Sequence, residues 1–287
     1  MDYRKKRYLV YTLITLFTAI LPFIQINGNQ IILLSFDKLQ FHLFGFVFNM
    51  NELYVMPFLL MFLFIGIFAM TSLLGRVWCG WACPQTIFRV IYRDLIESTI
   101  LDLRKINNKQ TELKYSKKSV QIKKFISIIL WSIITVLISS NFMLYFIPPA
   151  DFIEYIKNPN EHVFMIMFIL TTAAFLFYDI VFMKENFCTY VCPYSRIQSV
   201  LYDDDTKQVI YNTNRGGNIY QNSEKTIFNV KEWNSNEECT TCEACVKVCP
   251  TNIDIRKGLQ VECINCLECV DACTTVMGKL EKKTLVN

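Results

Sequence analysis

Cysteine carries the clearest chemical signal in this sequence, both in number and in spacing. The chain has 287 residues and twelve cysteines, all of which lie in four tight groups between Cys79 and Cys273. Two groups near the end of the chain repeat the spacing C-x2-C-x2-C-x3-C at an offset of 24 residues, and the first is followed by Pro250. In bacterial ferredoxins with two [4Fe–4S] clusters, three thiolates of such a run bind one cluster and the fourth binds the other.

The order of these eight cysteines predicts which thiolates share a cluster. The first [4Fe–4S] cluster is expected on Cys239, Cys242, Cys245 and Cys273. The second is expected on Cys263, Cys266, Cys269 and Cys249. A zinc site built from two C-x2-C pairs would use only four ligands, so eight cysteines in this order argue against zinc. Thr274 stands where a second proline often follows the last cysteine.

The other four cysteines form two matched pairs, each followed by proline. The segments Cys79–Pro84 and Cys188–Pro193 lie 109 residues apart and share aromatic, hydroxyl and aspartate positions around them. Cysteines four residues apart lie on one face of a helix, and proline is best tolerated where a new helix begins.

These two pairs predict a second redox site. We expect four thiols to converge there as catalytic and metal-binding groups: Cys79, Cys83, Cys188 and Cys192. Soft thiolates suit both Cu(I) and iron–sulfur clusters, so the site is expected to bind copper or a third cluster. The alternative is that the four are small buried residues at helix ends.

The elements that must position these cysteines are apolar segments long enough to cross a membrane. Hydrophobic residues make up 53% of the chain and charged residues 19%, against roughly 25% charged in soluble domains. A membrane span needs about 20 mostly apolar residues. Four segments meet this requirement: Tyr8–Ile26, Leu53–Leu74, Phe125–Ile147 and Val163–Met183. They pair into two hairpins that each lead to a Cys-x3-Cys-Pro motif, in the manner of internal membrane repeats.

Basic residues in the loops predict the orientation in the membrane. Residues 75–124 hold eleven Lys and Arg, whereas residues 27–52 and 148–162 hold one each. Because Lys and Arg are enriched in cytoplasmic loops, we expect the N-terminus, residues 75–124 and residues 184–287 inside. Every cysteine would then lie on the cytoplasmic side or at that edge of the bilayer, in the reducing compartment where disulfides are rare. The outer segment Ile31–Phe48 is too interrupted to span and is expected to be extended or an interfacial hairpin.

The predicted fold class is thus an all-α polytopic membrane protein of four helices, joined to a cytoplasmic α+β ferredoxin domain. The expected boundaries are a membrane domain over 1–202, a linker over 203–235 and the ferredoxin domain over 236–287. After the first pair, Arg89, Arg93 and Glu97 recur at four-residue spacing, which predicts an interfacial helix with a solvated charged face. The basic residues lie between apolar blocks, so no nucleic-acid partner is expected.

Taken together, the motifs resemble a known family of cytochrome oxidase accessory proteins. Trp78–Thr86, Glu185–Arg196 and Cys249–Cys263 resemble stretches of the CcoG, FixG and RdxA proteins, and the likeness covers essentially the whole chain. The resemblance implies an inner-membrane protein that reduces Cu(II) to Cu(I) for assembly of a cbb-type oxidase, with the membrane cysteines as the copper or redox site. It also implies oxidase-assembly and copper-transport proteins as partners. Members usually continue into a further span and an immunoglobulin-like domain, which we expect to be lacking here because fourteen residues follow Cys273.

Three functions are compatible with these residues. In the first, a cytoplasmic donor passes electrons through the ferredoxin domain to the membrane thiols, where thiolate ligands favour Cu(I). In the second, the chain is an electron-transfer subunit similar to NapH that exchanges electrons with quinol. In the third, the clusters are structural and the chain is an assembly scaffold. No nucleotide, flavin or nicotinamide motif is recognisable, so the electron donor must be another protein or quinol.

Overall fold

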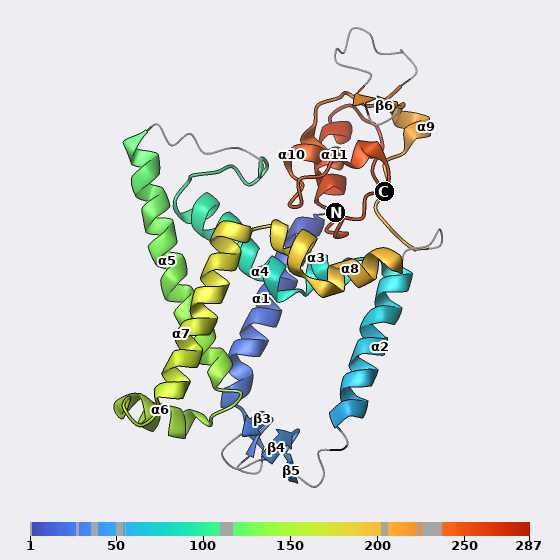
Figure 1. Cartoon of the computed structure of the whole chain (residues 1–287). Helices are drawn as coiled ribbons and strands as arrows, with labels where there is room; N and C mark the ends of the chain where they lie inside the picture. Colours follow the sequence, from blue (N-terminus) through green and yellow to red (C-terminus); the bar gives the residue numbers. More distant parts are fainter. Residues whose placement is uncertain are drawn as a thin grey trace. The chain divides into compact units, whose positions relative to one another are not determined.

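The structure, a computed structural model, forms two compact units, each assembled from separate stretches of the chain (Figure 1). It describes residues 2–26, 29–35, 40–49, 54, 56–109, 117–201, 206–221, 224–225 and 237–287. The first unit comprises Met1–Val10, Ile67–Lys124 and Glu185–Asn287. The second comprises Tyr11–Gly66 and Phe125–Lys184. The predicted division at 202 and 235 stays a prediction, and most of the predicted linker lies outside the described residues.

Long apolar helices account for most of the second unit. They are α1 (Tyr3–Ile20), α2 (Met56–Leu74), α5 (Lys118–Met143) and α7 (Val163–Tyr178), which continues as the π-helix η4 (Asp179–Met183). The short helices η1 (Leu21–Phe23) and α6 (Pro149–Lys157) follow α1 and α5. Within the described residues, three helical segments are long and apolar enough to cross a membrane: Met56–Leu74, Lys118–Met143 and Val163–Met183.

These three segments coincide with three of the four predicted spans. The first predicted span, Tyr8–Ile26, falls on α1, which begins at Tyr3 among basic residues and ends at Ile20. The helical part of that span therefore covers thirteen residues, from Tyr8 to Ile20, fewer than the roughly 20 that a crossing needs. The four-span count thus stays a prediction.

Side chains on these helices divide into an outward apolar face and an inward polar stripe. Phe62 on α2 and Leu137 on α5 are 69% and 63% exposed, as expected of side chains that face lipid. On α5, four fully buried residues recur every fourth position: Ser127, Trp131, Thr135 and Ser139. Small polar residues on one helix face allow close packing between helices inside a membrane.

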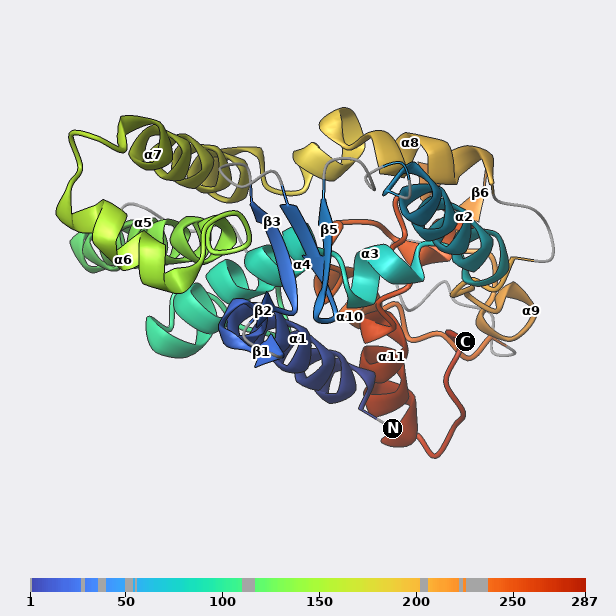
Figure 2. The same ribbon diagram turned by 90° about the horizontal axis from the view of Figure 1, so that it is seen from below.

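The segment after α1 is extended, as its broken apolar pattern predicted. Strands β3 (Ile32–Ser35), β4 (Gln40–Leu43) and β5 (Phe46–Asn49) form an antiparallel sheet and lie side by side in Figure 2. Phe44 and Gly45, both with positive φ, make the two-residue turn between β4 and β5, the conformation that tight hairpins favour. Strands β1 (Gln25–Ile26) and β2 (Asn29–Gln30) form a separate short pair.

The first unit contains every cysteine of the chain. Its further elements are α3 (Val77–Trp81), α4 (Pro84–Val90), the π-helices η3 (Ile91–Ile100) and η5 (Phe187–Val191), α8 (Pro193–Val200), α9 (Thr213–Gly216), β6 (Tyr220–Gln221), β7 (Glu224–Lys225), α10 (Ala244–Lys247), η7 (Ile255–Lys257) and α11 (Glu268–Gly278). Its apolar core joins Val209, Ile219 and Met277 to Leu285 and Val286. This core supports the loops that carry the ferredoxin cysteines.

Candidate functional site

Two small cavities collect the eight ferredoxin cysteines into the two predicted sets. The first cavity is lined by four of them: Cys239, Cys242, Cys245 and Cys273. The second is lined by the other four together with Cys245: Cys249, Cys263, Cys266 and Cys269. The crossed arrangement, in which the last cysteine of each run reaches the other cavity, is therefore present in the fold. Four converging thiols at each cavity fit a [4Fe–4S] cluster.

Both cysteine runs bend in the same way between their ligands. Thr241 and Glu243 in the first run have φ of 49° and 59°, and Asn265 and Leu267 in the second have 49° and 60°. Residues other than glycine avoid this left-handed region because it crowds Cβ against the backbone. Two such residues at matching positions in both runs wrap each loop around its cavity. Helices α10 and α11 begin directly afterwards; Cys249 follows the end of α10, and Cys273 lies within α11.

Burial opposes ionisation of one thiol in each set. Burial raises the pKa of Cys245 to about 12, and it raises the pKa of Cys263 to about 12. One arginine opposes each shift, Arg256 at Cys245 and Arg76 at Cys263. Cluster binding must therefore displace protons from buried thiols.

The two membrane-edge motifs fold into copies of one turn. The Cys83 amide N–H donates to the Trp78 carbonyl at 2.9 Å, and the Cys192 amide donates to the Phe187 carbonyl at 2.9 Å. Each bond spans five residues and closes a π-type turn. Proline follows in each motif and restricts the preceding cysteine to extended backbone, with ψ of 126° at Cys83 and 112° at Cys192.

This geometry corrects one expectation and confirms another. We expected both cysteines of a pair on one face of a continuous helix. Instead α3 ends at Trp81, and Cys83 lies in the break before α4, because Pro84 excludes the helical conformation there. The expectation that a new helix begins at each proline is confirmed, since α4 begins at Pro84 and α8 begins at Pro193.

The four motif thiols lie near one another. Burial raises the pKa of Cys79 to about 11, and Cys83 and Cys192 add to the rise. Burial also raises the pKa of Cys188 to about 12, with contributions from Cys83, Cys79 and Cys192. Among the described residues, no group of three or more His, Cys, Asp or Glu is arranged to hold one metal ion. The four thiols are thus close enough to influence one another, but they are not arranged around a single ion.

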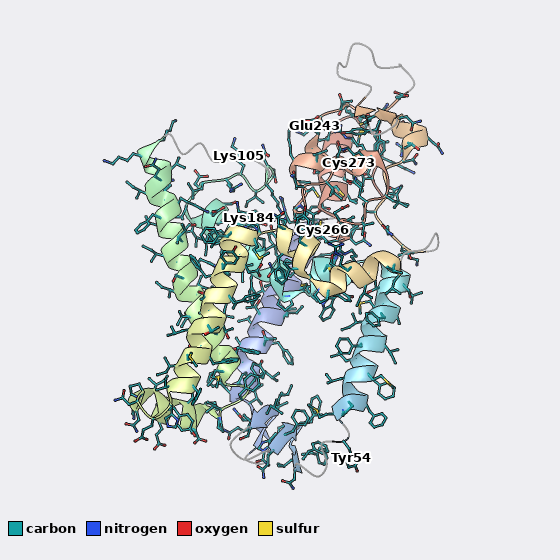
Figure 3. The ribbon with its side chains drawn as sticks, in the orientation of Figure 1. Tyr54, Lys105, Lys184, Glu243, Cys266 and Cys273 are labelled. Carbon is teal, nitrogen blue, oxygen red and sulfur yellow. The ribbon has the colours of Figure 1, made fainter. Side chains whose placement is uncertain are left out.

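The first motif packs directly on the loop of the second ferredoxin run. Cys79, Ile264 and Cys266 form one buried apolar cluster. Figure 3 labels a thiol from each cavity and shows Cys266 on the side of the ferredoxin part toward α3, with Cys273 farther away. A side chain at Gly80 would place Cβ 2.2 Å from the Ile264 carbonyl oxygen, so only glycine permits this approach. The Trp81 indole N–H donates to the Asn265 carbonyl at 3.1 Å.

Hydrogen bonds fix the same contact from both sides. The Arg76 guanidinium donates to the Val261 carbonyl at 2.7 Å and to the Gln198 Oε1 at 2.9 Å. The same oxygen accepts from the Cys79 thiol at 3.3 Å. The Asn265 amide donates to the Leu74 carbonyl at 2.9 Å. Both motif helices, α3 through Cys79 and α8 through Gln198, are thereby tied to the second cavity's loop.

A buried ion-pair network lies beside this contact. Glu268, next to the ligand Cys269, accepts from Arg7 and from Lys109, the latter at 2.6 Å. Lys109 also contacts Asp94 at 3.3 Å, and the Tyr8 hydroxyl donates to Asp94 at 2.7 Å. Charged partners at these positions hold the pKa of Asp94 well below its usual range, although burial alone would raise it. The network joins α1, η3 and α11.

The predicted solvated face after the first motif is wrong. Arg93 and Glu97 are 3% and 1% exposed. Arg93 contacts Glu185 at 3.2 Å, and Arg89 contacts the same carboxylate at 3.1 Å. Glu97 pairs with Lys124 and, at 3.0 Å, with Arg104. The charges face inward because partners from distant segments meet them there, and helical spacing alone does not reveal those partners.

Several residues of the site carry no signal that marks them in the sequence. Arg76 and Gln198 are ordinary polar residues near the cysteine pairs, and Asn265 is one intervening residue of a ligand run. Gly80 is the exception, because a glycine between two ligand-type cysteines signals a close backbone approach. Cysteine spacing identifies the ligands. Arg76, Gln198 and Asn265 instead form the hydrogen bonds that link the membrane-edge motifs to the loop of the second ferredoxin run.

Comparisons with known proteins identify two iron–sulfur regions in the chain. Residues 183–287 match the family described as "4Fe-4S dicluster domain", and residues 56–100 match one described as "4Fe-4S binding domain". The chain is 33% identical over 254 residues to protein RdxA of Cereibacter sphaeroides, covering 88% of this chain and 51% of RdxA. It is 32% identical over 259 residues to RdxB of the same organism, covering 88% and 52%.

A third relative is the nitrogen fixation protein FixG of Rhizobium meliloti, 29% identical over 257 residues, or 89% of this chain and 48% of FixG. The chain therefore spans about half the length of these curated relatives. No solved structure matches. The matched families and the three apolar helices support a membrane protein with 4Fe-4S domains.

Proposed function

Because the chain belongs to the family of RdxA, RdxB and FixG, we propose that it reduces Cu(II) to Cu(I) at the edge of a bacterial inner membrane. Electrons come from a one-electron donor protein in the cytoplasm. The Cu(I) product serves the assembly of a cbb-type cytochrome c oxidase, through copper-transport and oxidase-assembly partners. Copper is the substrate, and the clusters are resident cofactors.

The proposed cofactor ligands are the two sets that line the cavities. One [4Fe–4S] cluster is held by Cys239, Cys242, Cys245 and Cys273, and the other by Cys249, Cys263, Cys266 and Cys269. When bound, each cluster stores and releases one electron. The protein supplies buried thiols, wrapped loops and fixed charges around them.

The observation that carries the proposal is the packing of Cys79 against Ile264 and Cys266. It makes the second cavity the one that adjoins the membrane-edge thiols. At the first cavity Cys242 is exposed, which suits contact with an external donor. Electrons therefore pass from the first ligand set to the second and then to the thiols of the two motifs.

The four motif thiols suit copper for a chemical reason. Thiolate is a soft ligand and stabilises Cu(I) relative to Cu(II), so binding at the site favours the reduced ion. The step is one electron in and Cu(II) converted to Cu(I), with no covalent bond made or broken in the substrate. Each thiol that coordinates releases its proton.

Serine substitutions test this assignment. Replacing Cys79, Cys83, Cys188 or Cys192 by Ser should abolish Cu(I) production, read with a Cu(I) chelator under a reductant that feeds the clusters. Iron should stay at about eight per chain, because the two cavities keep their ligands. Thr189→Ala, an exposed change inside the second motif, is the matched control and should keep the parent rate.

Three outcomes would contradict the proposal in different ways. Copper reduction at the parent rate in the Cys79→Ser and Cys188→Ser variants would remove the thiols as the copper site. About twelve iron and no bound copper in the parent protein would make the thiols ligands of a third cluster. Oxidation of the clusters by quinone, with no response to Cu(II), would favour exchange of electrons with quinol.

A further inference from the structure

Buried arginines lie beside both cluster cavities, and their charges have different partners. Arg7 donates to the Cys266 carbonyl at 3.1 Å beside the second cavity, and its charge is paired with Glu268. Arg256 lines the first cavity and is 4% exposed. It bonds the Asp254 carboxylate twice, at 2.8 Å through Nε and 2.6 Å through Nη2. Glu243 lies 3.7 Å from the same guanidinium. The positive charge at the first cavity is therefore neutralised by carboxylates.

Arg76, also 4% exposed, contacts the second-run loop at Val261 and shares the Gln198 Oε1 with the Cys79 thiol. Its hydrogen bonds go to the neutral oxygens of Gln198 and Val261. In the part of the chain that the structure describes, no carboxylate lies within ion-pair distance of Arg76. Its charge lies close to the second-run loop, since Val261 stands two residues before the ligand Cys263.

The other charges near the second cavity largely balance. Glu268 is paired with Arg7 and Lys109, and Lys109 is shared with Asp94. Arg76 is thus the charge that distinguishes the second cavity from the first. A buried unpaired cation is costly, and anionic thiolate centres are the groups that can offset it.

We propose that Arg76 raises the reduction potential of the second cluster above that of the first. Added positive charge favours the reduced, more negative state of a cluster, so its potential rises. The first cluster lacks this effect because Asp254 neutralises Arg256. The direction of electron flow toward the membrane-edge thiols is then built into the charges of the fold. This inference rests on the proposed function for the direction of flow, whereas the potential difference itself does not.

The test is a redox titration of both clusters by EPR on the whole protein in detergent, without copper. Gln198→Glu places a carboxylate 2.9 Å from the Arg76 Nε without removing the arginine, which reproduces the pairing at the first cavity. We expect one of the two midpoint potentials to fall and the gap between them to narrow or close. Arg76→Gln should lower the same potential, whereas Arg76→Lys, which keeps the charge, should leave the gap in place.

Lys207→Gln is the matched control. It removes a positive charge beside the same loop, since the Lys207 carbonyl accepts from Asn265 at 3.1 Å, but its own side chain is exposed and screened by solvent. Both potentials should stay at their parent values in this variant. If Arg76→Gln fails to assemble clusters, Gln198→Glu decides the question alone.

Unchanged potentials in Gln198→Glu, or an equal fall in both, would overturn the role of Arg76. The copper assay distinguishes this failure from that of the proposed function. A shifted potential in a protein that never reduces copper would overturn copper reduction only. Unchanged potentials in a protein that reduces copper normally would overturn only the inference about Arg76.

Discussion

Cys83 and Cys192 occupy the same position in two copies of one turn, each with its amide bonded to the carbonyl five residues earlier at 2.9 Å. Each is held in extended backbone by the proline that follows. The sequence repeat at 109 residues is therefore also a repeat of backbone conformation. It brings two thiols from each copy to one place.

Removing either proline should loosen the copper site. With Pro84→Ala or Pro193→Ala, the preceding cysteine regains access to helical backbone and its thiol is no longer fixed. We expect Cu(I) affinity, measured by chelator competition, to fall roughly tenfold, the lower range for losing a group that orients a ligand. Pro149→Ala at the start of α6 is the control and should leave the affinity unchanged. Equal affinities in all three variants would show that the turn does not orient the thiols.

Copper binding should strengthen as pH rises. Burial raises the pKa of Cys79 to about 11 and of Cys188 to about 12, so both thiols are protonated in the free protein at neutral pH. Coordination must displace those protons, and Cu(I) affinity should rise about tenfold per pH unit for each coordinating thiol. Chelator competition across neutral to mildly alkaline pH measures the slope. A flat profile would mean that other groups hold the ion.

Gly80→Ala should slow electron transfer without removing a cofactor ligand. The new Cβ would lie 2.2 Å from the Ile264 carbonyl oxygen, so the second-run loop must move away from Cys79. We expect most of the rate of cluster reoxidation by Cu(II) to be lost in stopped-flow measurements, while iron content stays at the parent value. Gly278→Ala, where nothing lies within 4 Å, is the control and should behave as the parent protein. A normal rate in Gly80→Ala would place the electron route elsewhere.

Asp94→Asn should destabilise the first unit at neutral pH. The change leaves Arg93 and Lys109 buried beside a neutral group, and breaking a buried pair in this way costs about 3–5 kcal/mol in free energy of unfolding. The exposed Asp102→Asn is the control and should change little. Denaturant unfolding in detergent measures both. Stability of Asp94→Asn equal to that of the control would mean that the network contributes nothing.

The same network predicts a loss of stability in acid. Ion pairs hold the pKa of both Asp94 and Glu185 below their ordinary values, although burial opposes the shift. Their contribution is therefore complete above the ordinary carboxylate pKa of about 4 and is lost as pH falls toward the depressed values. The stability gap between the parent protein and Asp94→Asn should narrow over that range. A gap that widens in acid would contradict the assignment.

Reporter fusions should establish the orientation. The eleven-to-one excess of basic residues predicts that a reporter after Asn108 is cytoplasmic, whereas reporters after Asn29 and Asn158 are periplasmic. The Asn29 fusion also tests whether the α1 segment crosses the membrane. A cytoplasmic signal at Asn158 would reverse the side from which electrons arrive. A cytoplasmic signal at Asn29 alone would mean that neither α1 nor α2 crosses the membrane, because both ends of α2 would lie on the same side, and two spans would remain.

Cysteine spacing predicted the grouping at both cavities because the ligand pattern is local in sequence and each run folds on itself. Composition likewise located the three long apolar helices. Helical spacing did not predict that Arg93 and Glu97 are buried, because a charged residue gives the same sequence pattern whether it is buried or exposed. Burial depends on their partners, Glu185 and Lys124, which lie on other segments of the chain. The sequence also did not predict that Gln198 accepts a hydrogen bond from Arg76, because the two residues are 122 positions apart. Contacts at such separations depend on how the whole unit packs.

The bonds of Asn265 also bear on how the protein matures. Its side chain donates to the Leu74 carbonyl, 191 residues earlier in the chain, and to the Lys207 carbonyl. Translation completes those segments long before the second cysteine run leaves the ribosome. The end of α2, which bonds Asn265, is therefore synthesised before the loop of the second cysteine run. We therefore expect the loop of Cys263 and Cys266 to reach its final conformation, and to accept its cluster, only after the end of α2 is in place.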